Sequence, residues 1–270
     1  MNKALERVYG SHPVRAIMAT RASDVRQVVI LDGRTSKTHR SRRWTEYYLD
    51  LVRPTGVDPK LVTWQEFHRL TGLDANEKHQ GICLFVEPRP TYDEGGLDRL
   101  AEARLVVALD QITNPQNLGT ILRSSGFFGV DAVILLRDRA ADISPEALRV
   151  ASGGAEFVEI FRVTNLVRTL KALKDLGFWI YGLDERGSST AGDTEFHPKA
   201  VLVVGAEGEG LRRLTKETCD FLVRIPGGRQ GVESLNAAVA TSIAIAEVKR
   251  RPPHGPLGDY KPVERPIEEE

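Results

Sequence analysis

The feature that most constrains the fold is a series of short apolar runs between residues 104 and 226. The runs are nearly continuous and rich in β-branched residues, and they occupy 104–110, 132–136, 178–183, 200–205 and 221–226. Runs of this kind are typical of strands buried on both faces of a parallel sheet. Helical patterns alternate with them, around 118–128, 144–151, 164–176 and 234–250. The alternation predicts an α/β domain with a largely parallel sheet.

The chain is predicted to contain two domains. Its 270 residues correspond to roughly two units of about 150 residues, and a hydrophobic content of 41% indicates a folded core. The pattern of residues 1–88 indicates a small α/β domain, and a segment rich in Pro, Gly and acid predicts a linker at 89–103. The parallel-sheet domain spans 104–250, and residues 251–270 are predicted to form a flexible tail.

Charge is balanced overall but unevenly distributed. Lys and Arg number 37, as do Asp and Glu, which excludes a uniformly basic coat for nucleic acid. Residues 1–90 nevertheless hold 15 basic against 10 acidic residues, and the run 34–43 (RTSKTHRSRR) holds five of the basic ones. The run follows an apolar stretch and an Asp-Gly turn, so it is predicted to be a loop at a domain edge that attracts a polyanion. A solvated surface loop with no partner is the alternative.

Cysteine and histidine content argues against a metal or disulfide framework. The two cysteines, Cys83 and Cys219, exclude a disulfide scaffold and a four-cysteine zinc site, and both are expected to be inert. The six histidines lack metal-ligand spacing, so neither a metal site nor a catalytic histidine is expected.

No apolar run reaches the length of a membrane span, and the N-terminus does not resemble a secretory signal. A cytoplasmic protein is expected, with the mitochondrial matrix as the alternative.

The first candidate site is the segment 110–130, DQITNPQNLGTILRSSGFFGV. A predicted strand ends at its first residue, and Asn117 is expected to cap a helix that begins at the next residue. Gly119, Arg123 and Gly126 share one face of that helix. Glycine costs about 1 kcal/mol relative to alanine within a helix, so this pattern indicates that a second backbone or a ligand approaches the arginine. A cap beside a surface arginine is the simpler alternative.

Two further glycine-rich segments follow predicted strands. VVGAEGEGL (203–211) places three glycines and two acids at a strand end, where ligands commonly bind in α/β sheets. Its spacing is neither GxGxxG nor a P-loop, which disfavours a dinucleotide fold and a phosphate cradle. The third segment, 225–249, leads into a helix of small apolar residues that is expected to be buried, against a second subunit or the core. Ser234 and Asn236 lie at its start, where Ser234 could simply cap the helix.

Together, in this order and spacing, the three segments resemble the SpoU/TrmH family of SPOUT RNA ribose 2′-O-methyltransferases. The resemblance covers 105–250 and rests on NLGTILR (117–123), GAEGEG (205–210), and Ile225-Pro226 followed by SLN (234–236). YGSHPV (9–14) and HQGI (79–82) extend it over 5–86 and indicate the large-subunit ribosomal RNA guanosine-2′-O-methyltransferase subgroup (RlmB type). After Pro226, where a methionine is common in the family, a longer basic loop follows here.

The resemblance implies a structure that periodicity does not predict. The C-terminal SPOUT domain should contain a deep trefoil knot, a rare feature, and the N-terminal domain should be a ribosomal-protein-like substrate-binding domain. The knot should bind S-adenosylmethionine and pair with a second copy in a homodimer. The cofactor-binding residues carried over are Gly205, Ala206, Ile225, Pro226, Leu235 and Asn236.

The resemblance also implies a catalytic set and an RNA-binding set. The catalytic residues are Arg123, Asn117, Glu207, Ser234 and Asn236. A guanidinium has a pKa above about 12, so Arg123 is expected to stabilise charge and orient a phosphate, while the proton leaves to a phosphate, water or Glu207. Asn117 would position Arg123 or the ribose. The expected RNA-binding residues are those of the basic run: Arg34, Lys37, Arg40, Arg42 and Arg43.

Three other functions remain open from the sequence. Transfer RNA could replace ribosomal RNA as the substrate of the same chemistry. The chain could be an RNA-binding or ribosome-assembly factor without turnover, against which the complete catalytic set argues. A nucleotide-dependent oxidoreductase is disfavoured by the missing GxGxxG motif.

Overall fold

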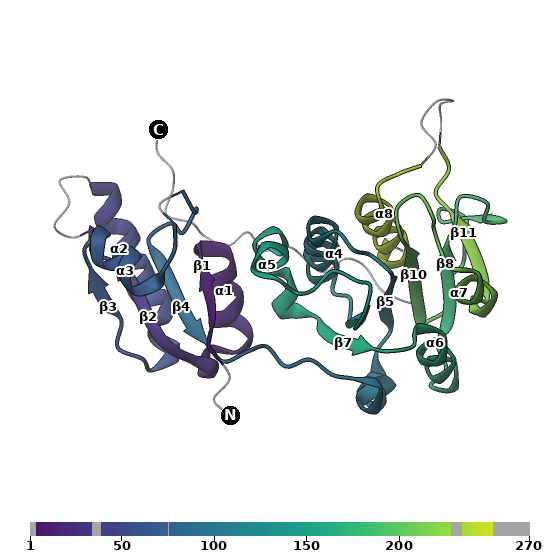
Figure 1. Ribbon diagram of the computed structural model, residues 1–270, viewed down its shortest axis with the longest axis horizontal. Coiled ribbons are helices and arrows are strands. Elements are labelled where there is room, and N and C mark those ends of the chain that lie inside the picture. The colour runs from purple at the N-terminus through teal and green to yellow at the C-terminus, as the bar shows by residue number, and fades with distance from the viewer. Residues whose placement is uncertain (1–3, 34–38, 75, 228–233, 251–270) are drawn as a thin grey trace. The chain divides into compact units, whose positions relative to one another are not determined.

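The computed structural model describes most of the chain as two compact units, which divide between Arg89 and Pro90 (Figure 1). The described residues are 4–33, 39–74, 76–227 and 234–250. The predicted tail, 251–270, therefore lies outside them. None of the helices within these ranges is long and apolar enough to cross a membrane.

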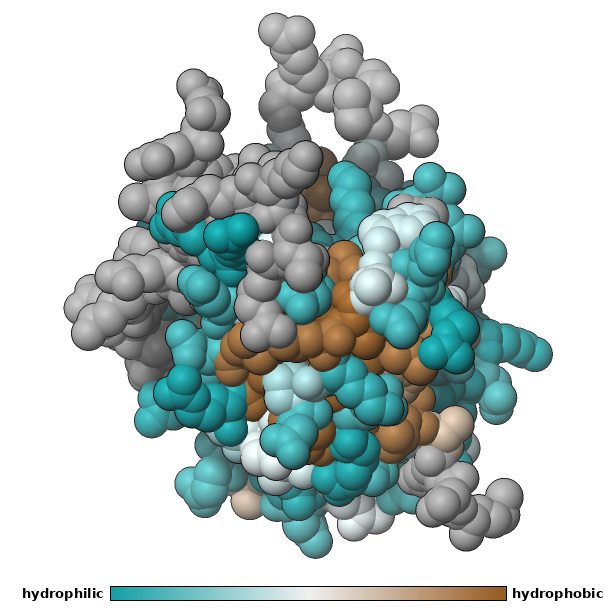
Figure 2. Space-filling view, turned by 90° about the vertical axis from the view of Figure 1, so that its left-hand side faces the viewer, coloured by the Kyte–Doolittle hydropathy of each residue, from teal (hydrophilic) through white to brown (hydrophobic). Residues whose placement is uncertain are grey.

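The first unit is a mixed sheet with three α-helices and two named 3-10 helices among its described residues. Its elements are β1 (Glu6–Tyr9), α1 (Ser11–Thr20), η1 (Ala22–Asp24), β2 (Val25–Leu31), α2 (His39–Val52), η3 (Arg53–Thr55), β3 (Lys60–Val62), α3 (Trp64–Thr71) and β4 (Ile82–Val86), where η marks a 3-10 helix. The strand order is β1-β4-β2-β3, with β4 antiparallel to both neighbours and β3 parallel to β2. Half-buried apolar side chains pack against its core, and Figure 2 shows hydrophobic residues gathered on the face that it views, with hydrophilic ones beside and below them.

The basic run at 34–43 is not wholly the loop that its composition predicts, because α2 begins at His39. Trp44, Tyr48 and Val52 recur every fourth residue and pack on the core of the unit, which gives the helix one apolar face. Of the five basic residues, two lie outside the described residues (Arg34 and Lys37), one has only its backbone described, within α2 (Arg40), and two have exposed side chains (Arg42 and Arg43).

The second unit contains the predicted parallel sheet. Its elements are η4 (Glu94–Glu102), β5 (Leu105–Asp110), α4 (Pro115–Phe128), β6 (Ala132–Leu136), α5 (Pro145–Ala151), η5 (Gly154–Phe157), β7 (Glu159–Val163), α6 (Leu166–Asp175), β8 (Trp179–Leu183), β9 (Ser189–Thr190), β10 (Ala200–Gly205), α7 (Arg213–Thr218), β11 (Phe221–Arg224) and α8 (Ala237–Arg250). The strand order among described residues is β7-β6-β5-β10-β8-β11-β9, and neighbouring strands are parallel throughout. The prediction of an α/β fold with a parallel sheet is confirmed.

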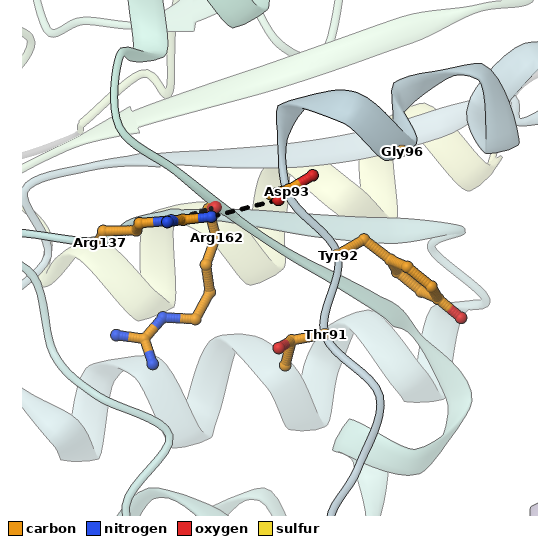
Figure 3. Close-up of a pocket in the computed structure, with 6 residues that line it drawn as sticks. All are labelled: Thr91, Tyr92, Asp93, Gly96, Arg137 and Arg162. Carbon is orange, nitrogen blue, oxygen red and sulfur yellow. Dashed lines mark hydrogen bonds and ion pairs between the residues drawn. The ribbon is translucent and has the colours of Figure 1, made fainter.

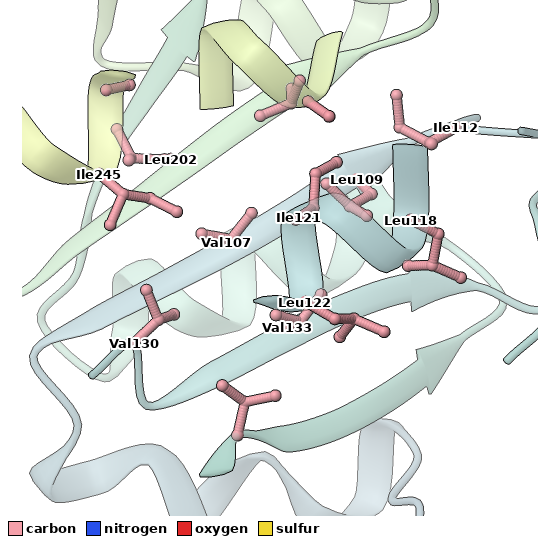
Figure 4. Close-up of a cluster of buried hydrophobic side chains, with 14 of the residues drawn as sticks. Val107, Leu109, Ile112, Leu118, Ile121, Leu122, Val130, Val133, Leu202 and Ile245 are labelled. Carbon is pink, nitrogen blue, oxygen red and sulfur yellow. The ribbon is translucent and has the colours of Figure 1, made fainter. Parts of the chain in front are cut away.

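Both faces of the sheet are buried, which explains the continuous apolar runs. In β5, Leu105, Val107 and Leu109 join the cluster formed with α4, α5 and α8, whereas Val106 and Ala108 face the cluster formed with η4 and α6. Successive side chains of a strand point to opposite faces of the sheet, so each strand contributes to both clusters. Figure 4 shows part of the first cluster, with side chains of β5 and α4 meeting those of β10 and α8.

Three features differ from the sequence-based predictions. The stretch 89–103, predicted to be a linker, contains η4, and Leu97 and Leu100 of that helix are buried in the second unit. β7 carries half-buried Glu159 and Arg162 beside its apolar residues, so its pattern does not stand out as a buried strand. The strand predicted over 221–226 ends earlier, at Arg224.

Candidate functional site

The candidate site lies at the edge of the sheet where the parallel strands have their carboxyl ends. After β5 the chain continues to β6 on one side, while β10 lies against β5 on the other side. Asp110 and Gly205, the last residues of β5 and β10, are paired in register. Strand order therefore reverses between these two strands, the place where α/β sheets commonly open a crevice for a ligand.

A closed ring of hydrogen bonds joins residues from all three candidate segments at this edge. The amide nitrogen Nδ2 of Asn117 donates to Oε1 of Glu207 at 2.7 Å. Nδ2 of Asn236 donates to Oδ1 of Asn117 at 2.9 Å and to Oε1 of Glu207 at 2.5 Å. Asn117 is buried, with an exposed fraction of 7%, whereas Glu207 and Asn236 are exposed. The ring therefore holds the Glu207 carboxylate through Oε1. Oε2 of Glu207 accepts no hydrogen bond from any described residue.

Asn117 is not the helix cap that the sequence predicts. The N-cap of α4 is Asn114, whose side chain accepts a hydrogen bond from the amide of Gln116, and Pro115 occupies the first helical position. Proline is favoured there because its missing N–H would have no partner in the helix. Asn117 therefore lies within the first turn, and its side chain is free for the ring.

Asn236, and not Ser234, caps α8. Oδ1 of Asn236 accepts hydrogen bonds from the amides of Ala238 at 2.9 Å and Val239 at 3.2 Å. The capping bond fixes the side chain, so that Nδ2 is directed to Asn117 and Glu207. Ser234 is exposed and contacts neither of them through a hydrogen bond in the described part of the chain. The structure thus brings together three of the five predicted catalytic residues.

Arg123 is exposed, and its guanidinium forms no hydrogen bond or ion pair with a described residue. It follows Asn117 by six residues on α4, which turns it roughly 120° around the helix, away from the ring of Asn117, Glu207 and Asn236. The flanking glycines have a packing role, since a Cβ on Gly119 would lie 2.5 Å from the carbonyl oxygen of Ala147, and one on Gly126 would overlap Gly154. The sequence predicted that a second backbone or a ligand approaches this face of the helix. In the structure a second backbone lies there, that of α5 and η5.

The loop after β10 is tightly closed. The amide of Gly210 donates to the carbonyl oxygen of Ala206 at 2.9 Å, and a Cβ on Gly205 would overlap the backbone of Gly210. Gly208 and Gly210 have φ of +80° and +68°, a conformation that favours glycine. A Cβ on Gly208, Gly210 or Gly227 would meet nothing within 4 Å, so the backbone of the loops after β10 and β11 is open to a ligand.

A second contact holds this loop, the ion pair of Asp110 and Arg212, which no motif in the sequence predicted. Asp110 is fully buried, and its carboxylate accepts hydrogen bonds from Nε of Arg212 at 2.6 Å and from the backbone amide of Arg212 at 3.1 Å. The pair ties the far end of the loop to the carboxyl end of β5. The sequence indicated this role only through the position of Asp110, an acidic residue at the end of an otherwise apolar run.

The remaining cofactor positions lie beside the loop or at its edges. Ile225 is half-buried and packs on the core cluster of α4 and α8, while Pro226 is exposed. Leu235 is exposed to 46%. Most of the basic loop between Pro226 and Ser234 lies outside the described residues.

Both cysteines of the chain carry neutral thiols. Burial raises the pKa of the Cys83 thiol to about 12, and burial likewise raises the pKa of the Cys219 thiol to about 12. Both thiols are therefore neutral at physiological pH. Within the part of the chain that the structure describes, no group of three or more His, Cys, Asp or Glu residues is arranged to hold a metal ion.

Both cysteines are expected to resist alkylation in the folded protein. A thiol with a pKa near 12 has a thiolate fraction of order 10⁻⁵ to 10⁻⁴ at pH 7.5, against about a tenth for a free cysteine of pKa 8.5. Labelling by iodoacetamide at pH 7.5, followed by mass spectrometry, should be at least 100-fold slower in buffer than in urea. Rapid labelling of native Cys219 would show that its thiol is activated.

The chain is similar to proteins of one family. The model of the SpoU rRNA Methylase family matches residues 104–246. The chain is 36% identical over 250 residues to the 23S rRNA (guanosine-2′-O-)-methyltransferase RlmB of Pseudomonas aeruginosa, covering 91% of this chain and 96% of that protein. The protein of the same name from Escherichia coli is 36% identical over 249 residues, covering 91% and 98%.

A solved structure of the same family has a similar fold. The SpoU methyltransferase AviRb from Streptomyces viridochromogenes, in complex with the cofactor AdoMet, matches with a TM-score of 0.69 and 25% identity, over 92% of this chain and 90% of that one. The family match spans more than half of the chain, and the relatives are matched over nearly their full length. The chain belongs to the SpoU rRNA methylase family.

Proposed function

We propose that the protein is an S-adenosylmethionine-dependent RNA methyltransferase that methylates the ribose 2′-hydroxyl of a guanosine in large-subunit ribosomal RNA. The observation that carries this proposal is the ring of Asn117, Glu207 and Asn236 at the switch point of the sheet, with Oε2 of Glu207 left open. The substrate follows from the two relatives, both named as 23S rRNA guanosine-2′-O-methyltransferases and matched over nearly their whole length.

The residues at the end of β10 fit the cofactor. S-adenosylmethionine would be held by backbone groups of the loop at Gly205 and Ala206, of Ile225 and Pro226, and of Leu235, with Asn236 beside them. This assignment is supported by the open backbone at Gly208, Gly210 and Gly227, where no side chain fills the space. When bound, the cofactor supplies a methyl group that is already activated for transfer.

The protein's own residues then have separate tasks. Two amide donors fix Glu207 through Oε1, so Oε2 is oriented to accept a hydrogen bond or the proton of a ribose hydroxyl. Arg123, without a partner among the described residues, is available to a substrate phosphate and to negative charge developing on the attacking oxygen. Asn117 acts as a positioning residue for Glu207. Ser234 stays a candidate for contact with the nucleotide.

The first unit is proposed to be the RNA-binding domain, occupying residues 1–88. Support comes from its excess of basic residues and from the exposed Arg42 and Arg43 on the first turns of α2. Arg40, Arg34 and Lys37 complete the proposed set. Neutralising the set should lower RNA affinity and reduce its dependence on salt concentration.

A knotted, dimeric methyltransferase domain at residues 104–250, within the second unit, is also part of the proposal. β11 lies on the far side of β8 from β10, whereas Asn236, directly before α8, donates to Glu207 of the 205–211 loop, and α8 joins the core cluster of α4 and β10. This placement of α8 supports the expected trefoil knot. The opposite face of α8 exposes Val239 and Ile243, four residues apart, with Leu235 before them. A second copy would cover this stripe, and sedimentation equilibrium should then give twice the mass of the 29.9 kDa chain.

A cytoplasmic location is supported by the bacterial relatives, with the mitochondrial matrix as the alternative.

Methyl transfer from labelled S-adenosylmethionine to separate RNA pools tests the proposal. Unmodified large-subunit ribosomal RNA, small-subunit ribosomal RNA and transfer RNA would each be incubated with the protein. Alkali-resistant label in the large-subunit pool alone is expected. Label in transfer RNA alone would overturn the substrate, and no label in any pool, with the cofactor bound, would favour a binding or assembly factor.

A further inference from the structure

A cavity of about 480 Å³ lies in the second unit, apart from the ring of Asn117, Glu207 and Asn236. It is lined by Thr91, Tyr92, Asp93, Gly96, Arg137 and Arg162. Figure 3 shows the side chains of Arg137, Arg162 and Thr91 around the hollow, with the ring of Tyr92 turned away from the two arginines. Two guanidinium groups and a hydroxyl, with a single carboxylate, make the lining a set of anion-binding groups.

The walls of this cavity are held by backbone hydrogen bonds. Tyr92 donates its amide to the carbonyl oxygen of Ile160 at 2.9 Å and accepts from the amide of Arg162 at 2.8 Å, so residues 91–93 run along the edge strand β7. Asp93 also caps η4 by accepting from the amide of Gly95. The cavity is therefore preformed, which lowers the entropy cost of binding a ligand.

Both arginines are accessible and only weakly committed to other groups. The side chain of Arg137 is 46% exposed; its ion pair with Asp93 is long, at 3.5 Å, and its Nε donates to the carbonyl oxygen of Arg162 at 3.1 Å. The side chain of Arg162 is 34% exposed and pairs with Asp142, itself 71% exposed, at 2.9 Å. Exposed ion pairs of this kind contribute about 0–1 kcal/mol, so a phosphate, which binds guanidinium in a bidentate manner, can replace the carboxylates.

The cavity lies at the same edge of the sheet as the candidate active site. Arg137 directly follows β6, and Arg162 lies near the carboxyl end of β7. β7 is three strands away from β10, which corresponds to about 14 Å at the usual strand spacing. The amide of Ala141 donates to the carbonyl oxygen of Ile112 at 2.7 Å, so the loop after Arg137 is tied to the loop that leads to Asn117. A short stretch of RNA can span this distance.

We propose that Arg137 and Arg162 bind a backbone phosphate of the substrate RNA, a few nucleotides from the ribose that is methylated. This inference rests on the proposed function, since it assumes that RNA reaches the carboxyl edge of the sheet. The contact is independent of base identity, because guanidinium groups recognise the phosphate alone. The contact fixes the position of the RNA strand along the protein, and the candidate active site selects the nucleotide.

RNA binding measured against salt concentration tests the proposal. A large-subunit ribosomal RNA fragment would be titrated with the wild-type protein and with Arg137→Gln, Arg162→Gln and Arg162→Lys at several KCl concentrations. Each glutamine variant should weaken binding several-fold and reduce the slope of log K against log salt, by at most the value of about 0.7 that one neutralised phosphate contributes, with unchanged affinity for S-adenosylmethionine. Arg162→Lys should keep most of the slope, because it keeps the charge.

Arg250→Gln is the matched control, since Arg250 is an exposed arginine, paired with Glu247, at the far end of α8. It should leave the slope unchanged. Inorganic phosphate at constant ionic strength should weaken RNA binding by the wild-type protein more than by Arg162→Gln. Phosphate binding to the cavity with an unchanged RNA slope in both glutamine variants would instead assign the cavity to a free anion and overturn the proposal.

The failure of this inference can be distinguished from the failure of the proposed function. Wild-type slopes in both glutamine variants of a protein that methylates ribosomal RNA would overturn the phosphate contact alone. A wild-type protein that neither binds nor methylates RNA would overturn both.

Discussion

Replacement of Arg123 by alanine is expected to lower kcat for RNA methylation by about 100- to 1,000-fold, the usual effect of removing one charge-stabilising donor. The Kd for S-adenosylmethionine should change by less than about twofold. The reason is structural: the guanidinium is exposed and has no partner among the described residues, so its removal breaks no bond that holds the fold. Alanine also has the higher helix propensity, so α4 should remain as stable as before.

Arg149→Ala provides the control, because Arg149 is an exposed arginine on the adjacent helix α5. It should retain near wild-type turnover. Arg123→Lys separates charge from geometry, since lysine keeps a point charge but loses the planar fork, and intermediate activity is expected. Single-turnover rates and equilibrium binding of the cofactor would be measured for each variant. Loss of cofactor binding in Arg123→Ala would contradict the assignment.

The sheet could be predicted from the sequence because burial on both faces leaves a mark on the chain. β5, β6 and β10 carry apolar side chains at every position except Asp110 and Gly205 at their ends. β7 at the edge is half exposed at Glu159 and Arg162, so the same reasoning does not detect it. What fails is the assumption that every strand of the sheet is covered on both faces.

The start of α4 shows why boundaries are harder to predict than elements. Asn114 and Asn117 are both plausible caps by residue type. The choice depends on the Asn-Pro dipeptide, because Pro115 fits the first helical position and Asn114 keeps an extended conformation, with φ of −83° and ψ of 120°. Composition alone favours neither asparagine, whereas the position of the proline does.

The contacts within the candidate site could not be predicted from local patterns. Asn117 lies 90 residues from Glu207 and 119 from Asn236 in the sequence. The resemblance to a family selects these residues but not which of them touch. The structure joins three of them in one ring and leaves Arg123 and Ser234 outside it, and this division is the basis on which we propose a positioning role for Asn117.

Gly205→Ala is expected to reduce the affinity for S-adenosylmethionine by about 10- to 100-fold, since overpacking typically costs about 1–3 kcal/mol. A Cβ at this position would overlap the backbone of Gly210, and backbone cannot move aside as a side chain can. The loop would have to shift, and Glu207, two residues further on, would lose its bonds to Asn117 and Asn236. The kcat should therefore fall together with the cofactor affinity, unlike in Arg123→Ala.

Gly192→Ala is the matched substitution, because a Cβ there would lie 3.9 Å from Oγ1 of Thr190, an ordinary contact. It should leave both the Kd for the cofactor and the kcat unchanged. Thermal unfolding and RNA binding, measured on the same samples, separate a shifted loop from a protein that fails to fold. If Gly205→Ala remains folded, wild-type affinity for the cofactor would mean that the closed conformation of the 205–210 loop is not needed for binding. The cofactor would then have to be held by the segments around Ile225 and Leu235 alone.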